Sequence, residues 1–400
     1  MKEEILDKSD NSDSLNNNKS LKKTKISTII ASLTFIGLIT YIILLIFNNR
    51  NIMNFSSNSS IKLLKEENDY SFVTEYITEE DDKTIEIINP NFKNIISKLK
   101  IDGEEVETCT SYNFKSKGIH KIYYTLNLEG VTSFEQMFYK NDYLTTISFS
   151  PLFNTENITT VERWFHSCNK LISVDLSHLN LRNVTAFTHV FGNSKSLKTV
   201  DLSNIYAEKL YDMSATFYSS SSLTFVNLTN FNAPELWQMI HTFRECTSLI
   251  SIDFTNFRAP KLKTLQNAFN MSPSLKSVNL SSIESDAFIM LSEAFNGCSS
   301  IEYIYLPKTK TKRDVNIWRA FRNCHSLKSI DLSNYTGRQL SYEAFEGCTN
   351  LTYIDISSYD NVPENLFSYL PEIGEIKVSK KAYDNIKDKI PEDWTIILVK

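Results

Sequence analysis

The stretch FRNCHSLKSIDLSN, residues 321–334, is one of three similar segments near the C-terminal end of the chain. The preceding copy is FNGCSSIEYIYLPK, from Phe295, and the following copy is FEGCTNLTYIDISS, from Phe345. The same pattern recurs upstream at steps of 27 and then six times 26 residues, and it ends with steps of 24 and 22. Its anchors are Phe138, Phe165, Phe191, Phe217, Phe243, Phe269, Phe295, Phe321, Phe345 and Phe367. A fixed period of this length is the signature of a solenoid.

Each copy predicts one short strand. In the copy that begins at Phe217, the apolar positions are Leu223, Val226 and Leu228, and the last two alternate with polar residues. Alternation of this kind is the period of a strand with one buried face. Because no single copy can bury its apolar side alone, we expect the copies to stack as coils with their strands in one parallel sheet.

The segment before each Phe predicts a short helix. Examples are PELWQMIHTF (234–243) and PKLKTLQNAF (260–269), in which Leu262, Leu265 and Phe269 are spaced three and four apart. Pro234 and Pro260 stand where such a helix would begin, a position that tolerates proline. The predicted fold is therefore a repeat solenoid of leucine-rich-repeat type, with a short parallel strand and a short helix in each coil of about 26 residues.

The repeat is similar to that of a known family. The spelling A-F-x-x-C-x-x-L-x-x-I-x-L appears as AFNGCSSIEYIYL, AFRNCHSLKSIDL and AFEGCTNLTYIDI, and it resembles the BspA-like leucine-rich-repeat surface proteins. The resemblance covers roughly residues 131–370. It implies a leucine-rich-repeat solenoid displayed at a cell surface, with attachment to host or matrix proteins as its role and no catalytic residues. Many family members are secreted, lipid-anchored or anchored near the C-terminus, and this chain departs from them at its N-terminus.

Residues 26–47 predict a single transmembrane helix. They form 22 uncharged residues, enough to cross a hydrocarbon core of about 30 Å. A cleaved signal peptide is the alternative, but it would have a shorter apolar region and small residues where Leu44 to Phe47 stand. Lysines 19, 22, 23 and 25 precede the segment and only Arg50 follows closely. The positive-inside rule then predicts residues 1–25 as a disordered cytoplasmic tail and places the remainder outside the plasma membrane.

The regions beside the repeats have their own patterns. Residues 48–75 contain NFSSNSS and are predicted to be a stalk or linker. Residues 76–130 include KLKIDGEEVE, in which Asp-Gly between alternating residues favours a hairpin, and they predict a small β cap or β domain. The solenoid is predicted over 131–370. Residues 371–400 read as strand, short helix and strand, and resemble the C-terminal cap of the same family.

A column of cysteines lies three residues after the Phe. Cys168, Cys246, Cys298, Cys324 and Cys348 share this column with Ser194, Ser220 and Ser272. Exchange between Cys and Ser suits a small residue packed in a turn, and buried free thiols are the favoured interpretation. A disulfide among Cys298, Cys324 and Cys348 stays open, because adjacent coils bring them within disulfide range although parallel side chains have poor geometry. Ligand spacings such as C-x-x-C are absent, so no metal is predicted.

Composition and motifs argue against an enzyme and against a nucleic-acid partner. The net charge is −5, whereas phosphate binding needs clustered Lys and Arg. The sequence has no Walker-type loop and no G-x-G-x-x-G, and its six histidines lie near no recognisable nucleophile motif. We therefore expect no catalytic residues, no cofactor and no metal.

The open face of the predicted sheet offers the candidate site. One outward column reads Asp175, Asp201, Asn227, Asp253, Asn279, Tyr305, Asp331 and Asp355. It is either a solvated ladder that keeps the sheet soluble or a ligand-facing strip. Tyrosines stand out against the small polar background, and tyrosine is favoured at contact sites. The predicted contact patch is Tyr303, Tyr305, Asp331, Tyr353 and Asp355.

Two functional hypotheses follow from these patterns. The first is a membrane-anchored surface protein that adheres to an extracellular protein or glycan through the open sheet face. The second is a structural coat protein with lateral self-contacts and no specific ligand. A clustering of irregular aromatic residues on one face favours the first, because binding faces carry hot spots whereas a coat has uniform faces.

Overall fold

The structure is a computed structural model that describes residues 70–309, 313–335 and 340–399. The predicted tail (1–25), transmembrane segment (26–47) and most of the predicted stalk lie outside the described residues. Within the described part of the chain, no helix is long and apolar enough to cross a membrane.

The array begins with a β module. Its strands are β1 (Phe72–Thr78), β2 (Lys83–Glu86), β3 (Ile96–Ile101), β4 (Glu104–Val106), β5 (Ser111–Phe114) and β6 (Gly118–Leu126), with a 3-10 turn η1 (Pro90–Ile95). Asp102 and Gly103 both have positive φ (49° and 94°) and join β3 to β4 as the expected hairpin. β1 begins four residues before the predicted boundary at 76, because FVTEYIT alternates buried and half-buried side chains as a strand does.

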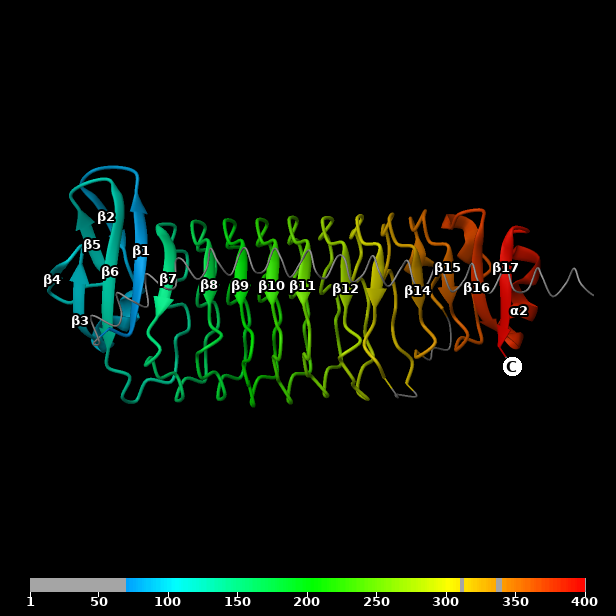
Figure 1. Cartoon of the computed structure of the whole chain (residues 1–400), viewed down its shortest axis with the longest axis horizontal. Helices are drawn as coiled ribbons and strands as arrows, with labels where there is room; N and C mark the ends of the chain where they lie inside the picture. Colours follow the sequence, from blue (N-terminus) through cyan, green and yellow to red (C-terminus); the bar gives the residue numbers. More distant parts are fainter. Residues whose placement is uncertain (1–69, 310–312, 336–339, 400) are drawn as a thin grey trace, which may run out of the picture. The chain divides into compact units, whose positions relative to one another are not determined.

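The β module and the first coils share one sheet. β1 pairs antiparallel with β6 on one side and with β7 (Leu144–Phe149) on the other. From β7 onward the strands run parallel, one per coil, in chain order along the array (Figure 1). They are β8 (Ser173–Asp175), β9 (Thr199–Asp201), β10 (Phe225–Asn227), β11 (Ser251–Asp253), β12 (Ser277–Asn279), β13 (Tyr303–Tyr305), β14 (Ser329–Asp331) and β15 (Tyr353–Asp355). The ladder is interrupted between β11 and β12, so the coil strands are divided between a nine-stranded and a six-stranded sheet. β2 and β5 form a separate two-stranded sheet.

The prediction of one helix per coil is wrong. Residues 234–243 form turns and a single-residue bridge at Gln238, which pairs with Asp212 in the coil before and Thr264 in the coil after. The N–H groups bond across coils, as in Phe243 to the carbonyl of Ala268 at 2.7 Å. Among the described residues of this region, 3-10 turns occur only in the last coils, as η2 (Tyr342–Phe345) and η3 (Leu366–Tyr369).

A column of left-handed residues explains why the helix does not form. Two residues before the Phe, φ lies between 52° and 56° in seven successive coils, although none of these residues is glycine. They are Arg163, His189, Ala215, His241, Asn267, Glu293 and Arg319. A residue in this region ends any right-handed helix. The three-and-four spacing of apolar residues therefore arises from tight turns that point side chains inward at similar intervals.

The core is built around the Phe column. All anchors from Phe138 to Phe345 are buried, whereas Phe367 is only partly buried. Their rings stack from coil to coil with centroids 4.9–6.0 Å apart and interplanar angles of 3–9°. The regular period in the sequence thus becomes a continuous aromatic stack, in which the ring of each coil lies on the rings of the adjacent coils.

The C-terminal segment closes the array with the expected strand, helix and strand. These are β16 (Gly374–Ser379), α2 (Lys380–Ile386) with a following 3-10 turn η4 (Lys387–Lys389), and β17 (Trp394–Val399). β16 pairs parallel with β15, and β17 pairs parallel with β16. Ser379 caps α2 by accepting a hydrogen bond from the N–H of Ala382 at 3.1 Å.

Candidate ligand-binding face

The middle residue of each coil strand points into the core and the two flanking residues point outward. In β10, for example, Val226 is buried while Phe225 and Asn227 are half-buried. Because the strands stack in register, the outward residues form two columns on an open face of the sheet. This open face is the surface on which the predicted contact patch lies.

The Asp/Asn column has a structural role that sequence reasoning missed. Each side-chain oxygen accepts a hydrogen bond from the N–H two residues later, at 2.8–3.1 Å, which is an Asx turn at the end of the strand. The acceptors are Asp175, Asp201, Asn227, Asp253, Asn279, Asp331 and Asp355. Interchange of Asp and Asn follows, because both supply the same acceptor oxygen.

The exception in this column has the same explanation. Tyr305 replaces the Asx residue in β13, and the residue two positions later is Pro307. Proline has no N–H to donate, so this coil needs no side-chain acceptor. Tyr305 therefore lacks the turn role that the Asp and Asn residues of this column have, and it is 45% exposed.

The structure brings four of the five predicted contact residues to the open face. Tyr303 is 41% exposed, Asp331 is exposed and Tyr353 is half-buried, with Ser329 between the two tyrosines in the ladder. Lys328 Nζ lies 5.3 Å from the centroid of the Tyr303 ring and also pairs with Glu302. Burial raises the pKa of Tyr353, and nearby Asp355 adds to that shift. The exposed part of this face thus combines tyrosine rings with both signs of charge.

Asp355 does not reach the exposed face. Its side chain is buried, one oxygen accepts from Lys377 Nζ at 2.7 Å, and the other accepts from the backbone and hydroxyl of Ser357. The cause is β16, which pairs with β15 and places Lys377 directly opposite Asp355. Asp355 therefore holds Lys377 and the turn at Ser357 beside the patch and is not exposed on it.

A second exposed aromatic pair was not anticipated from the sequence. Tyr211 (43% exposed) and Trp237 (38%) occupy equivalent positions in adjacent coils, and the N–H of Trp237 donates to the carbonyl of Tyr211. Lys263 of the next coil places its ammonium 5.5 Å from the Trp237 ring. Tyr211 and Trp237 stand directly before the bridge residues Asp212 and Gln238, and an alignment of the coils at that position would have found the pair.

The cysteine column is occupied by buried thiols, all free. Each Sγ donates to the carbonyl of the Phe that begins the preceding coil, at 3.0–3.1 Å, and the serines of this column make the same bond at 2.7–2.8 Å. The column therefore selects a small donor, which explains the exchange of Cys for Ser. Burial raises the pKa of the Cys298 and Cys348 thiols to about 12. These thiols are poor nucleophiles and poor metal ligands, because both roles need the thiolate.

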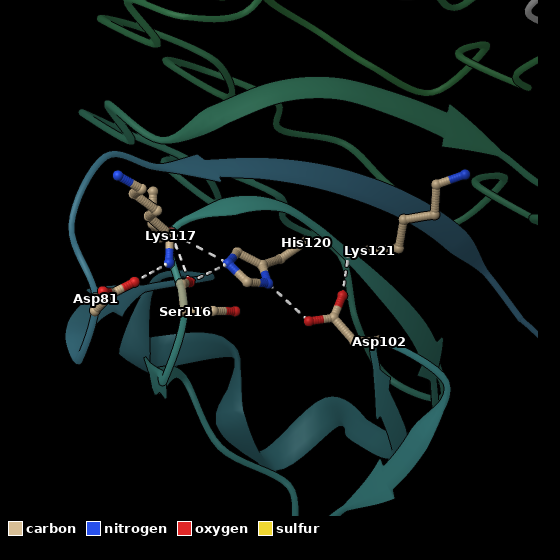
Figure 2. Close-up of polar contacts among 7 residues, drawn as sticks. Asp81, Asp102, Ser116, Lys117, His120 and Lys121 are labelled. Atoms are coloured by element: carbon tan, nitrogen blue, oxygen red, sulfur yellow. Dashed lines mark hydrogen bonds and ion pairs between the residues drawn. The ribbon is translucent and has the colours of Figure 1, made fainter.

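One polar cluster in the β module has the outline of a catalytic triad (Figure 2). His120 Nδ1 lies 2.7 Å from Asp102 Oδ2, and Nε2 lies 3.1 Å from the hydroxyl of Thr78. However, Nε2 also faces the carbonyl of Ser116 at 2.9 Å, and the Thr78 hydroxyl donates to that same carbonyl. Thr78 and His120 are buried, so a substrate cannot reach the hydroxyl. The cluster fastens the β3–β4 hairpin to β6.

Over the described ranges, no group of three or more His, Cys, Asp or Glu side chains is arranged to hold a metal ion. The geometry that remains as a candidate site is the open face, where exposed tyrosines, a carboxylate and a lysine lie on rigid neighbouring strands.

Parallel strands stacked at a fixed period around a core of Phe and Leu columns define the class of a leucine-rich-repeat solenoid. The comparisons with known families agree. Six copies of the BspA type leucine rich repeat region match residues 214–318 and 292–392, so these coils are similar to BspA-type repeats. Residues 105–231 match a family described as Mycoplasma protein of unknown function, DUF285. The expected resemblance is thereby confirmed.

Solved structures similar to this chain include a leucine-rich repeat protein from Bacteroides ovatus, at 17% identity over 68% of this chain and 76% of that chain, with a TM-score of 0.38. Another is a leucine rich cell surface protein from Faecalibacterium prausnitzii, at 19% identity over 58% of this chain and 80% of that chain, with a TM-score of 0.25. No curated protein matches the chain. The assignment rests on the family match and on the repeat geometry described above.

Proposed function

We propose that this protein is a cell-surface adhesion protein whose open sheet face binds an extracellular protein or glycan. The observation that supports this most directly is the exposure of Tyr303 and Tyr305 on one short strand, beside Asp331 and Tyr353. Tyrosine offers large contact area and a polar tip, and only a few such residues supply most of the binding energy of an interface. A rigid sheet holds these rings in place, so little ordering is needed on binding.

The proposed patch consists of Tyr303, Tyr305, Asp331 and Tyr353, with Asp355 and its partner Lys377 as support. A triple Tyr→Ser variant at 303, 305 and 353 is expected to lose adhesion to extracellular matrix proteins and glycans that the wild-type chain retains. Its melting temperature should change little, because the three hydroxyl-bearing rings lie on the outer side of the strands. The measurement is adhesion of the purified chain to a panel of such molecules.

A matched control removes equally exposed tyrosines elsewhere. Tyr206 and Tyr211 are 42% and 43% exposed, and Tyr218 is half-buried as Tyr353 is; their triple Tyr→Ser variant should adhere as the wild type does. If this control loses adhesion while the variant at 303, 305 and 353 keeps it, the binding face lies elsewhere. Uniform adhesion of both variants, together with self-association of the chain, would favour the alternative of a coat protein without a specific ligand.

We also propose that residues 26–47 anchor the chain in the plasma membrane with the solenoid outside. The support is the length of the uncharged run and the lysines that precede it. Protease added to intact cells is expected to remove residues after Asn48 and to spare a tag at Met1. Protection of a C-terminal tag would reverse the orientation, and a mature chain that lacks residues 1–47 would make the segment a signal peptide.

A further inference from the structure

The last strand of the array presents an open edge. β17 pairs with β16 over six residues, from Gly374↔Trp394 to Ser379↔Val399, without a bulge. Among the described residues, no strand pairs with its other edge. Alternate N–H and C=O groups along that edge are therefore directed away from β16, and such a row is a template for another strand.

The same strand is apolar on both faces. Ile396 and Ile397 are each 38% exposed and Leu398 is 47% exposed, and successive side chains of a strand point to opposite faces. Neither proline nor a charged residue interrupts Trp394–Val399. Proteins normally protect an open edge with such residues, and the outer face of a terminal repeat is normally polar. β17 has neither protection, so its edge is suited to contact with an apolar strand.

We propose that two copies of this chain associate through antiparallel pairing of β17 with β17 of the partner. The edge requires a strand, and the exposed side chains require that this strand be apolar on both faces; β17 itself meets both conditions. Antiparallel pairing about Ile397 places Ile396 opposite Leu398 of the partner subunit on one face and Thr395 opposite Val399 of the partner subunit on the other. Such a contact is two-fold symmetric and closes as a dimer.

Charges at the two ends of the strand favour this direction of pairing. Exposed Glu372, Glu392 and Asp393 lie near the Trp394 end. Lys380 and Lys381 follow Ser379, which pairs with Val399 at the other end. Antiparallel pairing sets the acidic end of one copy beside the lysines of the other, whereas parallel pairing sets acid against acid. The lysines are held by Asp384 and Asp360 in exposed ion pairs, which rearrange at little cost in free energy.

More apolar surface lies beside the Trp394 end. Ile373 directly precedes β16 and is 66% exposed, and Tyr369 in η3 is 40% exposed. These side chains extend the apolar surface beyond the strand itself. A larger buried area is needed because one pair of short strands alone falls below the size of a stable interface. This inference rests on the C-terminal strand and is independent of the proposed adhesion face.

Cysteine cross-linking of the full-length chain tests the pairing and its register. Residues opposite one another in an antiparallel pair have Cα atoms about 4.5–5.5 Å apart, within the range of a disulfide. Under mild oxidation with copper phenanthroline, Ile397→Cys should form a covalent dimer. A mixture of Thr395→Cys and Val399→Cys chains should cross-link as well, whereas Thr395→Cys alone should not. Ile119→Cys, at an isoleucine of the β module that is 66% exposed, is the control for random collision.

Two results would overturn the proposal: no covalent dimer from Ile397→Cys, or equal cross-linking of Ile119→Cys. Equal cross-linking of Thr395→Cys alone would replace the antiparallel register with a parallel one and thereby reject it. Hydrogen exchange of the wild-type chain adds a second readout, in which protection of the outward N–H groups of β17 should rise with protein concentration. Protection that does not depend on concentration would show that another segment of the same chain covers the edge. Adhesion of the triple tyrosine variant is unaffected by either result.

Discussion

Phe321→Ala is expected to lower the free energy of unfolding by about 3–5 kcal/mol. The ring is fully buried and stacks between Phe295 and Phe345, with centroids 6.0 and 5.6 Å away, so its removal leaves a cavity inside the column. Because each coil contacts only its neighbours, the damage should be strongest in the coils on either side. Hydrogen exchange across the array measures both the size and the spread of the effect.

Phe225→Ala is the matched control for this substitution. Phe225 is half-buried on the open face of β10, so its loss should lower the free energy of unfolding by about 1 kcal/mol. Unchanged protection in the Phe321 coil and its neighbours would contradict the assignment of the Phe column to the core. An equal effect of both substitutions would show that the stacked column has no special weight in stability.

A thiol reagent at pH 8 is expected to modify one cysteine of the folded chain, Cys109, and all six after unfolding. Cys109 is partly buried, whereas the other five are buried. With a pKa of about 12, Cys298 and Cys348 have about one thiolate in ten thousand at pH 8. Mass spectrometry of the labelled protein identifies the modified residues. Modification of the buried column at the rate of Cys109 would contradict the arrangement.

The raised pKa values also predict how stability depends on pH. The folded state keeps these protons while the unfolded state loses them near the ordinary thiol pKa of 9.0, so the unfolded state binds fewer protons above that pH. The stabilisation is complete below about pH 9 and is lost as pH rises toward the folded pKa of about 12. In a Cys298→Ser variant, the serine hydroxyl should donate to the carbonyl of Phe269, as Ser272 does to the carbonyl of Phe243. This variant should lose less stability as the pH rises above 9.

The strands and core could be predicted from the sequence because equivalent positions in successive coils have the same surroundings and therefore carry similar residues. The inward Val and Ile positions and the Phe anchors from Phe138 to Phe345 are buried as expected. The helix prediction failed because Leu262, Leu265 and Phe269 have helical spacing, while the left-handed backbone at Asn267 leaves no mark in residue type. That position is filled by Arg, His, Ala, Asn and Glu in different coils, so only the backbone reveals it.

The position of the candidate face could be predicted from the sequence, but the burial of Asp355 and the Asx turns were not predicted. Exposure of Tyr303 and Tyr305 follows from strand alternation alone. The burial of Asp355 depends on Lys377, which comes from a cap strand whose pairing with β15 carries no repeat signal. The Asx turns can be read from the sequence, since each Asp or Asn of the column has a residue with an N–H two positions later, whereas Tyr305 has Pro307 there.

The interchangeable bonds of the Phe and Cys columns have a consequence for how such genes can change length. Removing residues 217–242 would take out one 26-residue unit and bring Phe243 into the place of Phe217, stacked on Phe191. Cys246 would then meet the carbonyl of Phe191, as Ser220 does now. The ring stack and the thiol-to-carbonyl bond are both kept, and the array shortens by one strand spacing of about 4.8 Å. Recombination between copies can therefore adjust the length of the solenoid in whole coils while its core columns stay continuous.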